Sequence, residues 1–311
     1  MGKRIRLGRS YVLLATMLFA MSSMLAFADT TITIGVTMNN LATEYTANLA
    51  KAIEKKAKEV NVKIVMDDAQ GKADIQTSQI ENFIARKVDA VIMQPIEAEA
   101  MSPSVKKLQA AGIPIINVNS ITTAEPDAYV GSRDEEAGVL AVNYIASCIK
   151  GKGNIVMMHG HPGQSAEIQR TDGAKSAIAK YPDIKLIAEQ TAEWNRNQAM
   201  NLMQNWLSAN KDKINGVFAQ NDEMAMGALK ALEDSKVKKQ IVLVGVDGIR
   251  DALKAVKDGR LNATVLQDAT GQGAGAVEIA IKAAKKESFE KNTYIPFVLV
   301  TSENIGKFYT K

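Results

Sequence analysis

The sequence predicts an α/β fold of two lobes, each built on a parallel β-sheet with helices on both faces. Apolar runs and amphipathic segments alternate along the chain, which is typical of repeated β–α–β units. The pattern restarts after Gly151-Lys152-Gly153, so the second half repeats the architecture of the first. The length agrees, because 311 residues, 46% of them hydrophobic, can form two globular domains.

The first half has four short apolar runs separated by helical patterns. The predicted strands are 32–38, 62–66, 90–93 and 114–118. The predicted helices are 44–59, 73–86 and 97–111. The first helix is amphipathic, with Ala50, Ile53 and Ala57 on one face, and Gly112 suits the C-terminal cap of the third.

The second half continues the same alternation. Its predicted strands are 154–159, 184–188, 217–219, 241–246 and 263–266. Its predicted helices are 165–180, 195–209, 223–235 and 249–257. Both halves therefore predict Rossmann-like lobes, and two such lobes leave room for a cleft between them.

The first 28 residues have the pattern of a secretory signal peptide. Four basic residues precede an apolar run at 11–20, and Ala26-Phe27-Ala28 is a small-x-small cleavage signature. We expect cleavage after Ala28 and a mature chain that begins at Asp29. A membrane anchor is the alternative, although the run is short of the roughly 20 residues of a spanning helix.

Removing this segment makes the chain formally neutral. The segment holds four of the 38 basic residues and none of the 34 acidic ones, so 34 of each sign remain. This balance gives no support to nucleic-acid binding. Cys148 is the only cysteine, which excludes an intrachain disulfide, and export without disulfides suits a bacterial periplasmic protein.

Amides and carboxylates gather just after the predicted strands. In open α/β sheets, ligands bind beyond the carboxyl ends of the strands. The polar residues there are Asn39, Asn40, Gln94, Asn117, Asn119, His159, His161, Asn221, Asp222, Asp247, Gln267 and Asp268. Such groups suit a ligand with many hydroxyls. Turns and helix caps are the alternative for each position, and we expect Asp222 to cap a helix N-terminus by accepting backbone N–H groups.

Several segments together resemble one known family. They are GVTMNN, AGIPIINVN, GHPGQSAEIQRTDG, FAQNDEMAMGAL, VLVGVDG and ATVLQ. The mature chain is similar over nearly its whole length to the ribose-binding protein family, the type I periplasmic solute-binding proteins of ABC importers. The resemblance implies a non-enzymatic periplasmic protein, without cofactor or metal, that acts as a monomer and delivers a sugar or cyclitol to an inner-membrane permease.

The resemblance also implies how the lobes are assembled. Residues 29–132 with 268–297 would form the N-terminal lobe, and residues 133–267 with 298–311 the C-terminal lobe. The chain would cross between them near 120–132, near Gln267 and near 296–299. These three crossings would form a hinge that closes on the ligand.

The family's ligand positions fall on ten residues of this chain. They are Asn40, Tyr45, Asn119, Arg170, Trp194, Asn221, Asp247 and Gln267, with Ser132 and His161 at flanking positions. Tyr45 and Trp194 would cover the two C–H faces of a ring, while Arg170 and Asp247 would make charge-assisted hydrogen bonds to its hydroxyls. We expect Asn221 to face the cleft as well.

The chain departs from a ribose pattern at several of these positions. Extra residues follow Asn40, an amide replaces an acid at Asn119, and Trp194 stands where Phe is found. These departures resemble members that bind inositol-like cyclitols. We therefore hold myo-inositol as the leading ligand, followed by ribose and other pentoses or hexoses.

An enzyme, a transcription regulator and a sensor are the alternative classes of protein. An enzyme is disfavoured because His159 and His161 lack a third metal ligand, Ser165 is not in a nucleophile elbow, and the glycines at 271–275 resemble a dinucleotide loop only weakly. A lactose-repressor-like regulator would need a DNA-binding head before the strand at 32–38. A sensor that presents its ligand to a chemoreceptor has the same fold, and the sequence does not separate it from an importer.

Overall fold

The computed structural model describes residues 31–309, except 211, 212, 236, 238 and 239. The predicted signal peptide at 1–28 and its cleavage site lie outside the described residues. Residues 32–311 form one unit that contains every element below. Within the described ranges, every helix falls short of the length and apolarity that a membrane crossing requires.

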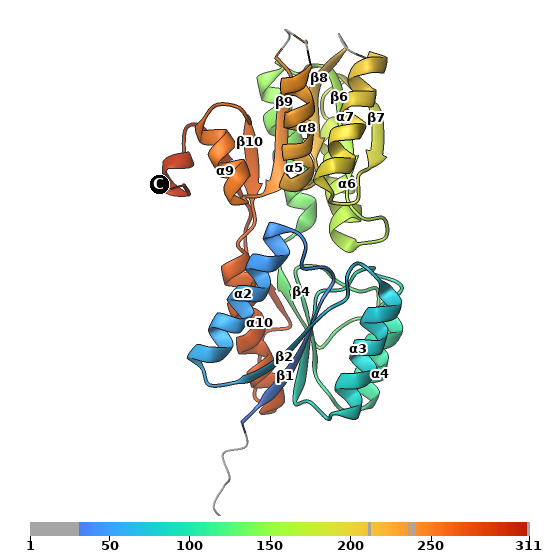
Figure 1. Ribbon diagram of the computed structural model, residues 1–311, viewed down its shortest axis with the longest axis vertical. Coiled ribbons are helices and arrows are strands. Elements are labelled where there is room, and N and C mark those ends of the chain that lie inside the picture. The colour runs from blue at the N-terminus through green and yellow to red at the C-terminus, as the bar shows by residue number, and fades with distance from the viewer. Residues whose placement is uncertain (1–30, 211–212, 236, 238–239, 310–311) are drawn as a thin grey trace, which may run out of the picture. The chain divides into compact units, whose positions relative to one another are not determined.

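The first sheet is wholly parallel and has the strand order β11-β5-β4-β3-β1-β2. Its strands are β1 (Thr33–Met38), β2 (Lys63–Asp68), β3 (Ala90–Met93), β4 (Ile115–Val118), β5 (Ala128–Gly131) and β11 (Asn292–Tyr294). Helices α2 (Glu44–Glu59) and α10 (Ala269–Ala284) pack together, and so do α3 (Ala73–Ala85) and α4 (Ser102–Ala110). Figure 1 shows the two pairs on opposite sides of the sheet.

The second sheet has the order β12-β10-β9-β8-β6-β7. Its strands are β6 (Lys152–His159), β7 (Asp183–Thr191), β8 (Ile214–Ala219), β9 (Val242–Asp247), β10 (Ala263–Leu266) and β12 (Val298–Thr301). The helices are α5 (Asp134–Cys148), α6 (Ser165–Ile178), α7 (Arg196–Asn210), α8 (Asp222–Asp234) and α9 (Arg250–Lys257), followed by the 3₁₀ turn η1 (Ile305–Lys307). The expected parallel arrangement holds except at the edge, where β12 runs antiparallel to β10.

The chain passes between the two sheets three times. The passages lie between β5 and α5, between β10 and α10, and between β11 and β12. The predicted fold class of two helix-covered α/β layers joined by three connections is therefore confirmed. In such sheets ligands bind beyond the carboxyl ends of the strands, so the loops there are where a site is expected.

Helix α4 begins five residues later than predicted. Residues 98–101 form a turn, and the backbone N–H of Ala98 donates to the carbonyl of Gly163, 2.9 Å away, in a loop of the second sheet. Pro103 then lies in the first turn of α4, where a missing N–H costs least. A long-range contact thus competes with helical periodicity in this segment.

Glycines bring two helix pairs into backbone contact. A Cβ on Gly173 of α6 would overlap the carbonyl of Glu135 in α5, and one on Gly138 would overlap the carbonyl of Arg170. Gly273 of α10 packs on Leu49 of α2 in the same way, with 3.0 Å between its Cβ position and the Leu49 carbonyl oxygen. The glycine-rich segment at 271–275 is thus used for close helix packing.

Candidate functional site

A cavity of about 470 Å³ lies where strand-end loops of the two sheets meet. That volume is within the usual range of small-molecule sites. Nine of the ten predicted ligand residues line it: Asn40, Tyr45, Asn119, His161, Arg170, Trp194, Asn221, Asp247 and Gln267. The strand-end positions Asn39 and Gln94 line it too. Further lining residues outside that pattern include Gln70, Gln164, Glu193, Asn195, Arg196 and Glu223.

Ser132 is the one predicted residue that does not line this cavity. It is buried, and its hydroxyl accepts a hydrogen bond of 3.1 Å from the Nε2 of Gln272. Gln272 in turn accepts a hydrogen bond from the Tyr45 hydroxyl, 2.9 Å away. Ser132 therefore supports a cavity residue through Gln272.

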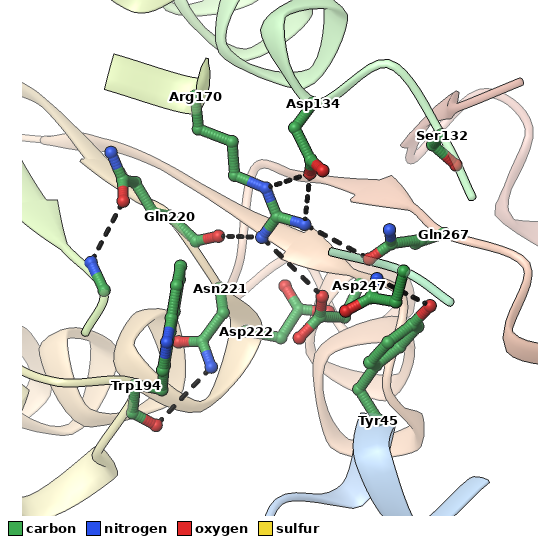
Figure 2. A network of polar contacts seen from close by, with 12 residues as sticks. Tyr45, Ser132, Asp134, Arg170, Trp194, Gln220, Asn221, Asp222, Asp247 and Gln267 are labelled. Carbon is green, nitrogen blue, oxygen red and sulfur yellow. Dashed lines mark hydrogen bonds and ion pairs between the residues drawn. The ribbon is translucent and has the colours of Figure 1, made fainter. Parts of the chain in front are cut away.

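The Arg170 guanidinium is buried at the centre of a polar network, which Figure 2 shows. Its Nε and Nη2 each lie 2.8 Å from Oδ1 of Asp134. Nη1 donates to the carbonyl of Gln220 at 2.6 Å, and Nη2 donates to Oε1 of Gln267 at 3.2 Å. The nearest carboxylate oxygen of Asp247 is farther away, 4.0 Å from Nη1. Most donors of the guanidinium are thus used by the protein itself.

Asp134 was missed by the sequence reasoning. It is the first residue of α5, followed by Glu135 and Glu136, so it looks like an ordinary acidic residue in a first helical turn. The glycine contact between α5 and α6 carries it to Arg170. No local sequence pattern reveals a partner 36 positions away.

Burial governs the electrostatics of this network. Burial disfavours the charged form of Arg170, but nearby Asp134 and Asp247 outweigh it, and the pKa of Arg170 is raised. Burial also raises the pKa of Asp247 well above its ordinary value, although Arg170 acts in the opposite direction. No donor in the described part of the chain hydrogen-bonds the Asp247 carboxylate.

Three amide atoms of cavity-lining residues are buried without a partner among the described residues. They are Oδ1 of Asn39, Oε1 of Gln94 and Nε2 of Gln267. An unpaired buried polar group costs about 1–3 kcal/mol, so each of these atoms favours a ligand that can hydrogen-bond to it. Together with Asp247, the cavity offers several acceptors and a donor, which is what a polyhydroxylated ring requires.

The two aromatic residues are held by hydrogen bonds at their polar ends. The Nε1 of Trp194 donates to Oε1 of Gln164 at 2.7 Å, and its ring packs on Gly160, where any Cβ would overlap it. The Tyr45 hydroxyl accepts from Nδ2 of Asn119 at 3.3 Å. Burial raises the pKa of Tyr45 well above its ordinary value, so the hydroxyl stays neutral.

Helix α8 is capped by Asn221 and not by Asp222. Asn221 is the N-cap of α8, and its Oδ1 accepts the N–H of Met224 at 2.9 Å. Its Nδ2 donates to the carbonyl of Trp194 at 3.4 Å, at the edge of the cavity. The expectation that Asp222 caps this helix is wrong, because its carboxylate accepts N–H groups from the loop after β9.

Charged side chains surround the outer part of the cavity. His161 approaches Glu97 of the first sheet's loops, with 3.4 Å between Nε2 and Oε1. Arg196 pairs with Glu223 at 2.7 Å and with Asp251 at 3.0 Å. Within the described ranges, no cluster of three His, Cys, Asp or Glu residues is placed to hold a metal ion.

Several curated proteins are similar to this chain over most of its length. A Rhizobium meliloti protein carries the provisional name of a rhizopine-binding protein. It is 38% identical to this chain over 288 residues, which cover 90% of this chain and 93% of the relative. The xylitol-binding protein of Mycolicibacterium smegmatis is 36% identical over 88% of this chain and 78% of its own length. The ribose import binding protein of Bacillus subtilis is 32% identical over 87% of this chain and 88% of its own.

Solved structures with bound ligands are similar as well. A solute-binding protein of an ABC transporter from Bacillus halodurans, with bound myo-inositol, has a TM-score of 0.85 and 37% identity, covering 89% of this chain and 96% of that one. Another from Actinobacillus succinogenes, with bound D-allose, has a TM-score of 0.84 and 34% identity, covering 89% and 100%.

The profile of a family described as the periplasmic binding protein domain matches residues 34–288. The relatives above are named as solute-binding proteins, and none is named as an enzyme. With its two helix-covered sheets and three connections, the chain belongs to the periplasmic binding protein family and has the type I fold of that family.

Proposed function

We propose that this protein is the periplasmic solute-binding component of an ABC importer and that it binds a neutral monosaccharide or cyclitol in the cavity. One observation carries the proposal: unpaired buried amide atoms and the Asp247 carboxylate surround a cavity that also contains Tyr45 and Trp194. Hydroxyls of a ring would satisfy the polar atoms, while its C–H faces would pack on the aromatic rings.

The charge balance supports a neutral ligand. Asp134 already neutralises Arg170, and Glu223 with Asp251 neutralises Arg196. The carboxylate of Asp247 therefore remains to accept hydrogen bonds from the ligand. A sugar acid would have to bury its carboxylate while Arg170 and Arg196 are already paired, and burying a charge without a partner is unfavourable.

Myo-inositol is our leading ligand, followed by ribose and other pentoses or hexoses. Support comes from the residues that depart from a ribose pattern, namely Asn119 and Trp194, both of which line the cavity. One similar solved structure contains myo-inositol and another contains D-allose, while two curated relatives carry names that specify xylitol and ribose. The class of neutral polyols is thus better supported than any single member.

The binding cycle follows from where the lining residues lie. In the lobe division that we propose, Asn39, Gln94 and Asn119 belong to residues 29–132, while Arg170 and Asp247 belong to residues 133–267. A ligand that bonds both sets stabilises the closed arrangement, and the closed protein would then dock on the permease. The relatives favour this transport role over the sensor alternative.

Thermal melting of residues 29–311 with a panel of ligands tests the proposal. The panel is myo-inositol, D-ribose, D-allose, xylitol and, as the acidic control, D-glucuronate. A neutral polyol of this panel at 100 times its Kd should stabilise the folded protein by about 2.7 kcal/mol and raise the Tm, because only the folded state binds it. No shift with any neutral compound, and no polyol co-purifying by mass spectrometry, would contradict the proposal.

A further inference from the structure

Asp222 lies behind the cavity and connects the end of β8 with β10 and with the loop after β9. It is fully buried, it is the first residue of α8, and it is absent from the cavity lining. Its Oδ2 accepts the backbone N–H of Gly248 at 2.7 Å and that of Ile249 at 3.0 Å. Its Oδ1 accepts the hydroxyl of Thr264 in β10 at 2.7 Å. Every one of these donors belongs to β10 or to the loop that follows β9.

The two N–H groups belong to the residues directly after Asp247. Asp247 has a backbone φ of +125° and Gly248 a φ of +75°, so the chain leaves β9 through two consecutive residues in the left-handed half of φ space. A non-glycine residue is strained there and persists only when its surroundings hold it. Asp222 supplies the acceptor that holds the end of this turn.

The sequence also leaves space for the Asp222 carboxylate. A Cβ on Gly245, two residues before Asp247 in β9, would overlap Oδ1 of Asp222. A Cβ on Gly248 would lie 2.9 Å from the Leu266 side chain, so this position is also confined. The strand, the turn and the carboxylate are therefore fitted to one another.

The residue at this turn is Asp247, and its carboxylate accepts no hydrogen bond from the described part of the chain. Asp247 lines the cavity, and its closest cation, Nη1 of Arg170, is 4.0 Å away and already donates to Gln220. Without a restraint on its backbone, the Asp247 side chain could move toward Arg170 and lose its direction into the cavity.

We propose that Asp222 is a positioning residue that holds the turn after β9 and thereby directs the Asp247 carboxylate at the hydroxyls of the bound ring. This inference rests on the proposed function of the cavity. Asp222 itself would make no contact with the ligand. Its effect on affinity would pass through Asp247.

A double-mutant cycle on the mature chain tests this role by calorimetry. The probe is whichever of myo-inositol, D-ribose, D-allose and xylitol raises the wild-type Tm most. Asp222→Ala should weaken its binding by about tenfold or more, equivalent to about 1.4 kcal/mol. In the Asp247→Ala background the same change should alter Kd by less than about threefold, since the group that Asp222 positions is then absent. Equal losses in both backgrounds would overturn the proposal.

Two further variants separate positioning from loss of stability. Asp222→Asn keeps an oxygen that can accept the Gly248 and Ile249 N–H groups, so it should recover most of the affinity that Asp222→Ala loses. Val256→Ala creates a core cavity in α9, on the same sheet, and should lower the Tm without changing Kd. If Kd weakened in proportion to the loss of Tm in Asp222→Ala, Asp222→Asn and Val256→Ala alike, the role of Asp222 would be purely structural.

A measurement without any ligand keeps this inference distinct from the proposed function. In Asp222→Ala, the amide hydrogens of Gly248 and Ile249 should exchange faster than in the wild type and in Asp222→Asn. If no panel compound binds the wild type, the cavity assignment fails whatever the exchange result. If a compound binds and exchange is unchanged in Asp222→Ala, the positioning role fails alone.

Discussion

At the scale of single residues, the cavity concentrates strain as well as polarity. Trp194, Asn119 and Asp247 all line it with positive φ angles of 60°, 66° and 125°. Asn119 directly follows β4, Trp194 lies in the turn after β7, and Asp247 is the last residue of β9. Backbone geometry of this kind directs side chains before any ligand arrives, which lowers the entropic cost of binding.

Removing either principal contact should weaken binding strongly. Trp194→Ala removes the ring that would cover one face of the ligand, and Asp247→Ala removes the unsatisfied acceptor. We expect each change to raise Kd tenfold or more, where tenfold corresponds to about 1.4 kcal/mol. Asp258→Ala, which removes a surface carboxylate paired with Lys254, is the control and should leave Kd unchanged. Unaltered affinity in both cavity variants would contradict the cavity assignment.

The pH dependence of stability should change in Asp222→Asn. Burial raises the pKa of Asp222 from its ordinary 3.8 to about 7, although its hydrogen bonds act in the opposite direction. The native state then holds this proton more tightly than the unfolded chain, so the contribution to stability is complete below about pH 4 and is lost as the pH rises through about 7. The asparagine cannot titrate, so this loss disappears.

Urea unfolding of the ligand-free protein at pH 5 and pH 8 measures this effect. The free energy of unfolding of the wild type should fall more between these values than that of Asp222→Asn, by about 1 kcal/mol or more. The pKa values of Asp134 and Asp247 are also raised by burial, but both residues are present in both proteins. Parallel pH profiles would show that Asp222 does not titrate in this range.

At the scale of elements, helix pairs built on glycine position the charged groups. The α5–α6 contact brings Asp134 beside Arg170, and in the α7–α8 contact Gly227 packs against the carbonyl of Arg196. Such close approach requires a position without Cβ, because any side chain would separate the helix axes. The same glycines thus determine both packing and the ion pairs at the cavity.

Gly173→Ala should therefore impair both stability and binding. The added methyl would overlap the Glu135 carbonyl and push α6 away from α5, which should cost about 1–3 kcal/mol of stability. Arg170, on the same helix, would move relative to Asp134, so Kd should rise. Gly306→Ala places its methyl in open space and is the matched control for Tm and Kd. The same Tm and the same Kd in Gly173→Ala and Gly306→Ala would contradict this role of Gly173.

At the scale of the whole described unit, contacts around the cavity join segments of the two sheets. Glu44, at the start of α2, accepts the N–H of Arg250 at 2.9 Å, and its own N–H donates to Glu223 at 3.4 Å. On another side, the N–H of Ile121 donates to the hydroxyl of Ser165 at 2.8 Å. These contacts would have to break before a closed cavity could release its ligand.

Glu44→Ala should speed ligand release without touching the cavity. Glu44 is outside the cavity lining, so the loss of its bond to Arg250 acts only on closure. We expect koff, measured by stopped-flow fluorescence of Trp194, to rise about twofold to fivefold, with little change in kon. Glu54→Ala, on the exposed side of the same helix, is the control. A loss confined to kon would contradict a role in holding the closed state.

Local sequence patterns were sufficient for most elements but failed where distant contacts compete. The bounds of α2 and β3 were predicted correctly to the residue, because both elements depend on side chains within a few positions. The start of α4 was misread because Ala98 bonds the loop at Gly163. The short strands β5, β11 and β12 were not predicted, since three or four residues show no decisive period.

The sequence by itself determined the α/β class, the division into two sheets, the family and nine residues that line the cavity. It could do so because polar residues that follow parallel strands lie at one edge of each sheet, and because the family resemblance supplied Tyr45, Arg170 and Trp194. Only the tertiary structure decided that Asp134 pairs with Arg170, that Ser132 acts through Gln272, and that Asp222 holds the turn after Asp247. These partners lie 26 to 140 positions apart, and only helix packing and strand order bring them within hydrogen-bonding distance.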